Sequence, residues 1–357
     1  MSKIKVAVIF GGASSEHDIS LISASNIIRN MPEEKYSVTC IGITKKGRWL
    51  YYPGDVDGIE SGEWEKDPDC TSAVISPDPL HKGIIIMENG EYTIKKVDVV
   101  FPVLHGKNGE DGTIQGLLEL SRIPYVGCGL LSSAACMDKA YTHTVLDNNG
   151  IKTAKWRMLN HRNINHLDDA CRDIADDLGF PMFVKPANSG SSIGINKVDD
   201  IPSLKEAIKI AFSHDNKVVI EEFIKGQELE VAVFGYDSPF ASFVGEIGKS
   251  NDFYDYDSKY INNSVVLHIP ARIPYERVKD FRAVALDAYK AMGCKGLSRI
   301  DFFLTEDGEI VLNEINTMPG FTSISMYPKL MEDVGMTYGY LIDKLLEQAI
   351  ENSDKNY

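Results

Sequence analysis

The sequence lacks the features that mark secreted, membrane-spanning and zinc-binding proteins. Six cysteines include no Cys-x-x-Cys pair, and eight histidines lack zinc-site spacing. No apolar run approaches the roughly 18 residues that a membrane-spanning helix needs. The first apolar run begins by Lys5, so a signal peptide is not expected. We therefore expect a cytoplasmic protein with reduced thiols and no membrane partner.

The chain also lacks a basic surplus. Its 37 Lys and Arg residues against 52 Asp and Glu residues give a formal net charge of −15. Proteins that grip a phosphate backbone normally carry clustered positive charge, so no nucleic-acid partner is expected. The composition, 43% hydrophobic and 25% charged, is that of a globular protein. The length of 357 residues predicts two or three domains.

The pattern of apolar runs predicts an α/β fold. Residues 5–10 form a continuous apolar run that ends at two glycines, as a buried parallel strand does. Similar apolar runs occur at 36–43 and 99–104. A helical segment precedes the first of these runs, and another follows the second. This alternation predicts a doubly wound parallel sheet over the first 125 or so residues, covered on both faces by helices.

A polar hairpin is predicted at residues 298–316. Asp307-Gly308 is a leading signal for a two-residue type I′ turn, and such a turn fixes the strand register. Phe303 would then lie opposite Leu312. The opposite face of the hairpin would be apolar. Directly paired residues share a face, so this register would bring together Arg299, Asp301, Glu314 and Asn316.

Those four side chains suggest a cation site. Two facing carboxylates repel, so a cation is expected between Asp301 and Glu314. Oxygen ligands of this kind suit Mg²⁺ or Mn²⁺ rather than zinc, and Arg299 adds a permanent donor for an oxyanion. A solvated polar face with an incidental Arg–Asp pair would explain the hairpin alone equally well.

Residues 185–194 form a Gly/Ser-rich loop after a predicted strand. Backbone N–H groups and hydroxyls in such a loop can surround phosphate oxygens, and Lys185 supplies a cation. The segment is not the P-loop motif, and a plain connection is the alternative interpretation. The next strand, 218–224, could enclose an adenine and accept its amino proton through Glu221, although a buried strand also explains residues 218–220.

Taken together, six ordered segments resemble the D-alanine–D-alanine ligase family of the ATP-grasp superfamily, along nearly the whole chain. They are residues 11–20, 105–112, 137–139, 185–194, 253–260 and 313–325. The resemblance implies an α/β ATP-grasp fold in three domains. These would be an N-terminal substrate-binding domain (1–127), a central domain with the phosphate loop (128–225), and a C-terminal domain with the metal-binding hairpin and a mobile loop at 249–263 (226–357).

The family resemblance also implies an activity. The carboxylate of one D-alanine would attack the γ-phosphate of ATP to give an acyl phosphate. The amine of a second D-alanine would then displace phosphate, giving D-alanyl-D-alanine for peptidoglycan synthesis. ATP and two Mg²⁺ or Mn²⁺ ions are the implied cofactors, and a homodimer is typical of the family. A D-alanine–D-serine ligase of the glycopeptide-resistance type is the alternative.

The resemblance assigns nucleotide and metal roles by position. The metal ligands would be Asp301, Glu314 and Asn316. The phosphate-binding residues would be Lys139, Lys185, Ser192 and Lys259. The base and ribose would contact Phe183, Glu221, Phe223, Ile224, Glu228 and Phe303.

It also assigns the substrate-binding and catalytic residues. A hydrogen-bonded group around the first substrate would comprise Glu16, Ser191 and Tyr260. Arg299 and the Gly320 backbone N–H would bind the oxyanion. The remaining substrate contacts would be His105, Ser325 and Met326. A favourable charge at a helix N-terminus would explain Glu16 as well, and His105 could be an ordinary loop histidine.

The second substrate and the competing functions remain open at this point. Tyr260 and the apolar Met326 favour D-alanine over D-serine, although one small group changes pocket preference by only about 1–3 kcal/mol. The rival interpretations are another ATP-grasp ligase, a non-catalytic sensor on the same fold, and a dehydrogenase. The last ranks lowest because no Gly-x-Gly-x-x-Gly fingerprint follows the first strand.

Overall fold

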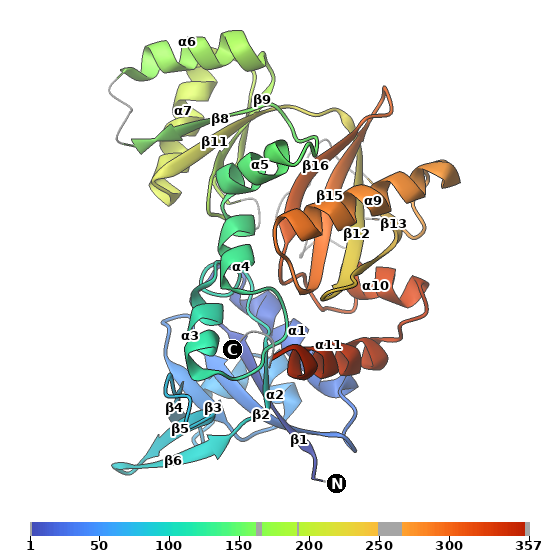
Figure 1. The fold of residues 1–357 in the computed structure, drawn as a ribbon. Helices are drawn as coiled ribbons and strands as arrows, with labels where there is room; N and C mark the ends of the chain where they lie inside the picture. The colour runs from blue at the N-terminus through green and yellow to red at the C-terminus, as the bar shows by residue number, and fades with distance from the viewer. Residues whose placement is uncertain (1, 162–165, 191–192, 249–265, 354–357) are drawn as a thin grey trace.

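The computed structural model describes residues 2–161, 166–190, 193–248 and 266–353. It is built around three β-sheets with helices packed on and between them (Figure 1). Four residues with predicted site roles lie outside the described ranges, namely Ser191, Ser192, Lys259 and Tyr260.

The N-terminal sheet is mixed. Its order is β6-β5-β4-β3-β2-β1-β7. The strands are β1 (Ile4–Gly11), β2 (Tyr36–Ile43), β3 (Trp49–Tyr52), β4 (Thr71–Ile75), β5 (Gly83–Glu88), β6 (Glu91–Lys96) and β7 (Val99–Pro102). The prediction of parallel pairing holds for β1 with β2 and β7. The other four strands pair antiparallel and were not predicted, because short half-exposed strands carry a weak apolar signal.

Helices cover this sheet and continue into the next part of the chain. They are α1 (His17–Asn30), α2 (Val56–Glu60), η1 (Glu63–Lys66), α3 (Thr113–Ser121), α4 (Leu130–Met137) and α5 (Lys139–Asn148). Asp138 caps α5 by accepting hydrogen bonds from the Ala140 and Tyr141 N–H groups. Figure 1 shows α4 and α5 running from the N-terminal sheet toward the central one.

The central sheet is antiparallel, in the order β10-β9-β11-β8. Its elements are β8 (Trp156–Asn160), α6 (Leu167–Leu178), β9 (Met182–Pro186), β10 (Asn196–Val198), α7 (Ile201–His214) and β11 (Lys217–Glu222). An apolar core joins α6 and α7 to the sheet through Cys171, Leu204 and Ile220. Its two inner strands, β9 and β11, carry two of the predicted base-binding residues, Phe183 and Glu221.

The C-terminal sheet follows the order β14-β13-β12-β15-β16. Its elements are β12 (Gly226–Gly235), β13 (Phe240–Gly248), β14 (Val266–His268), α9 (Tyr275–Ala291), β15 (Gly296–Thr305), β16 (Ile310–Asn316), α10 (Met326–Asp333) and α11 (Tyr338–Ser353). One core contains Phe10 and Phe101 of the N-terminal sheet together with Phe321 and Leu341. The chain after β16 is therefore packed onto the N-terminal sheet, which fixes the hairpin relative to it.

The β15–β16 hairpin confirms the predicted polar pairing but corrects the turn. Asp301 lies opposite Glu314, and Arg299 lies opposite Asn316. The turn has three residues, 306–308, because the Thr305 N–H donates to the Glu309 carbonyl. Among the described turn residues only Gly308 has a positive φ, +82°, so a type I′ turn does not form.

A β-bulge compensates for the longer turn. The register shifts by one residue between Asp301 and Phe302, leaving Asn313 as the extra residue. Between the turn and the shift, Phe303 lies opposite Val311 rather than Leu312, so that prediction was wrong. On the far side of the shift from the turn, the predicted partners are restored. The bulge is therefore what places Asp301 and Glu314 side by side.

Candidate active site

A cavity of about 510 Å³ lies where the three sheets meet. Its walls come from the start of α1, the loop after β7, α5, the Gly/Ser loop, β12, the β15–β16 hairpin and residues 317–326. The predicted site residues that line it are Glu16, His105, Lys139, Arg299, Glu314, Asn316, Gly320, Ser325 and Met326. The fold thus brings into one cavity residues that are more than 300 positions apart.

Arg299 is held between two carboxylates on the cavity floor. Its Nε and Nη2 atoms donate to the two oxygens of Asp301, each at 2.7 Å. Nε also lies 3.0 Å from Glu230 Oε2 on the neighbouring strand β12. Burial opposes the charge, but Asp301 and Glu230 raise the pKa of Arg299 well above its ordinary value. The guanidinium is thus a fixed, permanently charged donor.

Glu230 was not predicted as a site residue. Its side chain is buried, and it lines the cavity beside Arg299. The signal available in the sequence was its position two residues after Glu228, which places both on one face of strand β12. The sequence does not show that Glu230 meets Arg299, because that contact depends on strand β12 lying next to the hairpin in the sheet.

The hairpin fits a hard divalent cation better than zinc. Within the described residues, no group of three or more His, Cys, Asp or Glu side chains could hold a metal ion. The hairpin instead offers two carboxylates on adjacent strands and the Asn316 amide, whose Nδ2 lies 3.1 Å from Asp301 Oδ2. A few oxygen ligands of this kind suit Mg²⁺, which also takes oxygens from substrate phosphates and water.

The N-terminal wall is formed around Glu16. This buried residue is the N-cap of α1 and lines the cavity, so it faces the cavity as well as the helix N-terminus. Gly106 has a φ of +70°, and a Cβ there would lie 2.3 Å from Glu16 Oε2. Gly190 of the Gly/Ser loop approaches the same oxygen, with a Cβ position 3.0 Å away. The two glycines let chain segments close around one carboxylate.

Glu110 is a second carboxyl group in this wall that was not predicted. The Gly106 N–H donates to Glu110 Oε2 at 2.6 Å. Burial, and then the nearby charge of Glu16, raise the pKa of Glu110 to about 8. The residue falls within the 105–112 segment, but nothing in the local pattern shows that its side chain turns toward Glu16.

His105 holds the loop that follows the hairpin. Its Nδ1 lies 3.0 Å from the Met318 carbonyl oxygen, and its Nε2 lies 3.1 Å from Ser23 Oγ. The Phe321 N–H donates to the same Ser23 oxygen at 3.3 Å. Burial lowers the pKa of His105, which favours a neutral ring that donates through Nδ1. His105 therefore fixes the segment that contains Gly320, besides lining the cavity.

Another part of the cavity wall combines a helix N-terminus with an apolar side chain. Ser325 is the N-cap of α10, and its Oγ accepts from the Thr322 N–H at 3.0 Å. Met326 follows in the first turn and is buried against Gly245, where a Cβ would lie 2.7 Å from the methionine sulfur. A helix N-terminus attracts a carboxylate, and the methionine presents an apolar surface beside it.

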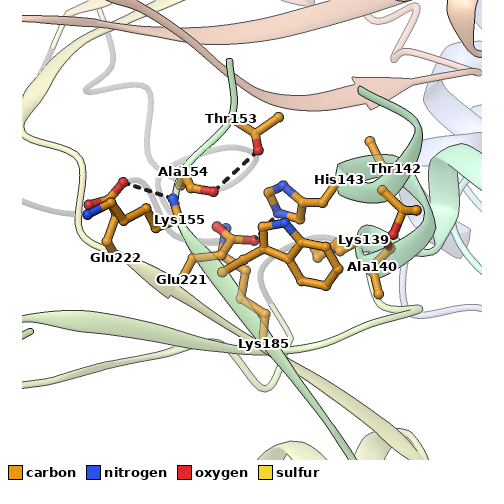
Figure 2. Close-up of polar contacts among 12 residues, drawn as sticks. Lys139, Ala140, Thr142, His143, Thr153, Ala154, Lys155, Lys185, Glu221 and Glu222 are labelled. Atoms are coloured by element: carbon orange, nitrogen blue, oxygen red, sulfur yellow. Dashed lines mark hydrogen bonds and ion pairs between the residues drawn. The ribbon is translucent and has the colours of Figure 1, made fainter. Parts of the chain in front are cut away.

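A largely buried ion pair lies next to the cavity-lining residue His143, although neither of its members lines the cavity itself. Glu221 was predicted to meet the base and Lys185 to meet phosphates, but here Lys185 Nζ lies 2.6 Å from Glu221 Oε2 (Figure 2). Burial would raise the pKa of Glu221, but Lys185 and His143 lower it far below its ordinary value. Lys139 Nζ donates to the Ser189 carbonyl at 2.8 Å, which ties α5 to the Gly/Ser loop.

The remaining predicted base-binding residues lie on strands near this pair. The Phe183 and Phe223 rings have centroids 5.9 Å apart. Phe303 lies opposite Glu228 across β15 and β12, on the other side of the connection between β11 and β12 at residues 223–225. Ile224 lies in that connection. These residues occupy two sheets, so their spacing around a base depends on how the sheets are placed.

Comparison with known proteins gives a consistent result. The model of the "D-ala D-ala ligase N-terminus" family matches residues 5–128, and that of the "D-ala D-ala ligase C-terminus" family matches residues 145–347. The chain is 49% identical to a D-alanine–D-alanine ligase of Acetivibrio thermocellus, covering 99% of this chain and 98% of the relative. It is 47% identical to one of Thermoanaerobacter, covering 99% of each.

Two solved structures resemble this one along their whole length. The VanG D-Ala:D-Ser ligase from Enterococcus faecalis superposes with a TM-score of 0.90 at 43% identity, covering 98% of this chain and 100% of that one. The D-alanine–D-alanine ligase from Coxiella burnetii superposes with a TM-score of 0.86 at 34% identity, covering 99% and 97%.

Proposed function

This chain belongs to the D-alanine–D-alanine ligase family, and from that premise we propose that it joins two D-alanine molecules into D-alanyl-D-alanine at the expense of ATP. The dipeptide would serve as a precursor of peptidoglycan. The observation that carries the proposal is the convergence of Glu16, Arg299, Glu314 and Ser325 on one cavity of about 510 Å³. That volume suits small substrates beside a triphosphate rather than a macromolecule.

The chain's own residues would divide the work within this cavity. Glu16 would bind the ammonium group of the first D-alanine, whose carboxylate would then lie toward the hairpin. Attack of that carboxylate on the γ-phosphate releases ADP and forms an acyl phosphate. Arg299 and the Gly320 N–H would stabilise the oxyanion that forms when the second amine attacks the acyl carbon and phosphate leaves.

Other residues would bind charge and position the nucleotide. Lys139, Lys185 and Lys259 would neutralise phosphates, and Ser192 would also contact the nucleotide. Ser191 and Tyr260 would join Glu16. Asp301, Glu314 and Asn316 would hold two divalent ions, which would neutralise the triphosphate when bound. We place these roles in three domains, 1–127, 128–225 and 226–357, with the cavity between them.

The second substrate is proposed to be D-alanine. Ser325 and the N-terminus of α10 would hold its carboxylate, and the buried Met326 would contact its methyl group. D-serine is the alternative, because the structural similarity to the D-Ala:D-Ser ligase from Enterococcus faecalis extends over 98% of the chain. A polar substrate side chain would leave its hydroxyl against an apolar surface, which weakens that alternative.

We further propose a cytoplasmic homodimer, as the family typically forms. Among the described helices, none combines the length and the apolar composition needed to cross a bilayer. Small amino acids and ATP would be the binding partners, and the acidic chain would not bind nucleic acid.

The test is phosphate release with ATP, Mg²⁺ and a panel of D-amino acids, followed by mass identification of the product. We expect release that depends on D-alanine and yields D-alanyl-D-alanine, with kcat/KM for D-alanine above that for D-serine as the second substrate. Phosphate release without a dipeptide, or none with any amino acid, would overturn the proposal. A higher kcat/KM for D-serine would overturn only the assignment of the second substrate.

A further inference from the structure

A buried histidine, His143, lies at the wall of the cavity next to Glu221, and it was not predicted as a site residue. His143 lies in the middle of α5 and is 3% exposed. It lines the cavity, and its ring lies toward Glu221 of the central sheet (Figure 2). A histidine in a helix is most often part of a core, so its contacts must decide whether it does more.

His143 and Lys185 share one carboxylate. His143 Nε2 lies 3.0 Å from Glu221 Oε1, while Lys185 Nζ lies 2.6 Å from Glu221 Oε2. The carboxylate next to an ammonium group is ionised and can only accept hydrogen bonds, so the His143 Nε2 must carry the proton and donate it. The two donors come from different elements, α5 and β9, and hold the two oxygens of Glu221 in fixed directions.

The other ring nitrogen takes no part in this contact. His143 Nδ1 is buried and has no hydrogen-bond partner among the described residues. An N–H group at that atom would be buried without an acceptor, which is costly. His143 therefore acts through Nε2 as a single directed donor.

The ring is also fixed from its flat side. The Trp156 indole stacks on it, with centroids 5.1 Å apart and an interplanar angle of 15°. Trp156 Nε1 in turn donates to Asp147 Oδ2 at 2.9 Å, one helical turn along α5 from His143. In the register, Trp156 lies directly opposite Glu221. Strand β8 and helix α5 therefore clamp the imidazole in the plane that meets Glu221.

We propose that His143 is a positioning residue of the nucleotide site, which holds Glu221 in the one orientation that presents an oxygen to the 6-amino group of the adenine base. The inference rests on the proposed use of ATP and adds to it a residue that sets base selectivity. Each carboxylate oxygen can accept a second hydrogen bond, so Glu221 can receive the amino group while His143 and Lys185 remain in place. Without His143, the carboxylate is free to turn toward Lys185 alone.

The experiment compares three substitutions at this position. His143→Gln keeps a side-chain N–H at about the position of Nε2, His143→Asn ends one bond short of Glu221, and His143→Phe keeps a ring against Trp156 but has no donor. The readout is the selectivity for ATP over ITP, which lacks the 6-amino group, measured both as equilibrium affinity with Mg²⁺ and as kcat/KM. Leu146→Val, a core change on the same helix, is the control for lost stability.

We expect His143→Asn and His143→Phe to raise the KM for ATP about tenfold and to lower ATP/ITP selectivity about fivefold, with kcat and the KM for D-alanine changed far less. His143→Gln should stay within about twofold of the wild type. Unchanged selectivity in His143→Asn, or an equal loss in His143→Gln and in Leu146→Val, would overturn the inference. Should His143→Asn fail to fold, His143→Phe makes the same comparison.

The affinity measurements separate this inference from the proposed function. Nucleotide binding needs no dipeptide synthesis, so a chain that makes no product but loses ATP/ITP selectivity in His143→Asn would contradict the function and support the role of His143. If ligation is normal and ATP/ITP selectivity is the same in all variants at position 143, the proposed function is supported and the role of His143 is contradicted.

Discussion

The two largely buried charged clusters of the active site differ in their charge balance. In the hairpin cluster, made of Glu230, Arg299, Asp301, Glu314 and Asn316, three carboxylates surround one guanidinium. In the Glu221 cluster, made of His143, Lys185 and Glu221, one carboxylate meets one ammonium group and one imidazole ring. The first has an excess of negative charge, and the second is balanced.

This difference predicts how each cluster responds to ligands. An acid-rich buried cluster is completed by cations, since paired carboxylates in a low dielectric are otherwise costly. A balanced cluster is complete without a ligand, and under the proposed roles Lys185 would share its charge between Glu221 and a phosphate of the nucleotide. The hairpin should therefore govern metal dependence and chemistry, and the Glu221 cluster should govern nucleotide affinity.

The largest expected effect comes from removing the guanidinium of the hairpin cluster. Arg299→Ala should lower kcat by about 10²- to 10³-fold, as loss of an oxyanion donor does, while ATP affinity changes little. Steady-state kinetics and ATP binding measure the two quantities. Arg272→Ala is the matched control. Arg272 also donates two side-chain hydrogen bonds to a buried glutamate, Glu246, but the Arg272 side chain is 62% exposed. A near-normal kcat in Arg299→Ala would remove this residue from the reaction.

A smaller effect is expected from neutralising one carboxylate of the same cluster. EDTA should abolish activity and Mg²⁺ restore it, and Glu314→Gln should raise the Mg²⁺ concentration needed for half-maximal rate by about tenfold or more. Glu309→Gln, at the exposed turn of the same hairpin, is the control. If Glu314→Gln and the wild type respond alike to Mg²⁺, the hairpin is not the metal site.

The extent of prediction from sequence is clearest in this hairpin. The sequence correctly predicted that Asp301 lies opposite Glu314, but the prediction assumed a two-residue turn that does not form. The longer turn and the bulge at Asn313 shift the register in opposite senses, and neither is visible in the alternation of polar and apolar residues. Sequence pattern therefore identified the face but not the local geometry.

The missed residues have a common physical reason. Glu110, Glu230 and His143 acquire their importance from partners on other elements, namely Glu16, Arg299 and Glu221. Local periodicity shows which side of a strand or helix a residue occupies, but not which distant side chain it meets there. The strands of residues 49–96 were missed for a related reason, because short strands with one exposed face carry little apolar signal.

Glu110 provides a pH test at the edge of the hairpin cluster. Its folded-state pKa is about 8, above the ordinary value of 4.5, so the folded chain binds more protons than the unfolded chain between those values. Stability should therefore fall as the pH rises from about 5 to about 9, and Glu110→Gln should reduce that fall by about 2–4 kcal/mol. Chemical denaturation at both pH values measures it. An equal pH dependence in the variant and the wild type would contradict the assignment.

The smallest effect should come from a charged pair outside both clusters. Lys209 and Glu206 form an exposed ion pair on α7, with side chains 63% and 66% exposed. Lys209→Ala should change the free energy of unfolding by less than about 0.5 kcal/mol and leave the kinetics unaltered, since solvent screens such pairs. A change comparable to that of Glu110→Gln would show that burial does not distinguish the clusters from the surface.

The most direct test of the account follows an oxygen atom. D-alanine carrying ¹⁸O in its carboxylate is incubated with ATP, Mg²⁺ and the enzyme, and the inorganic phosphate is examined by mass spectrometry. The account predicts that one labelled oxygen passes to phosphate for each dipeptide formed, because the carboxylate attacks the γ-phosphate before the amine displaces phosphate. Dipeptide formed together with unlabelled phosphate would contradict it.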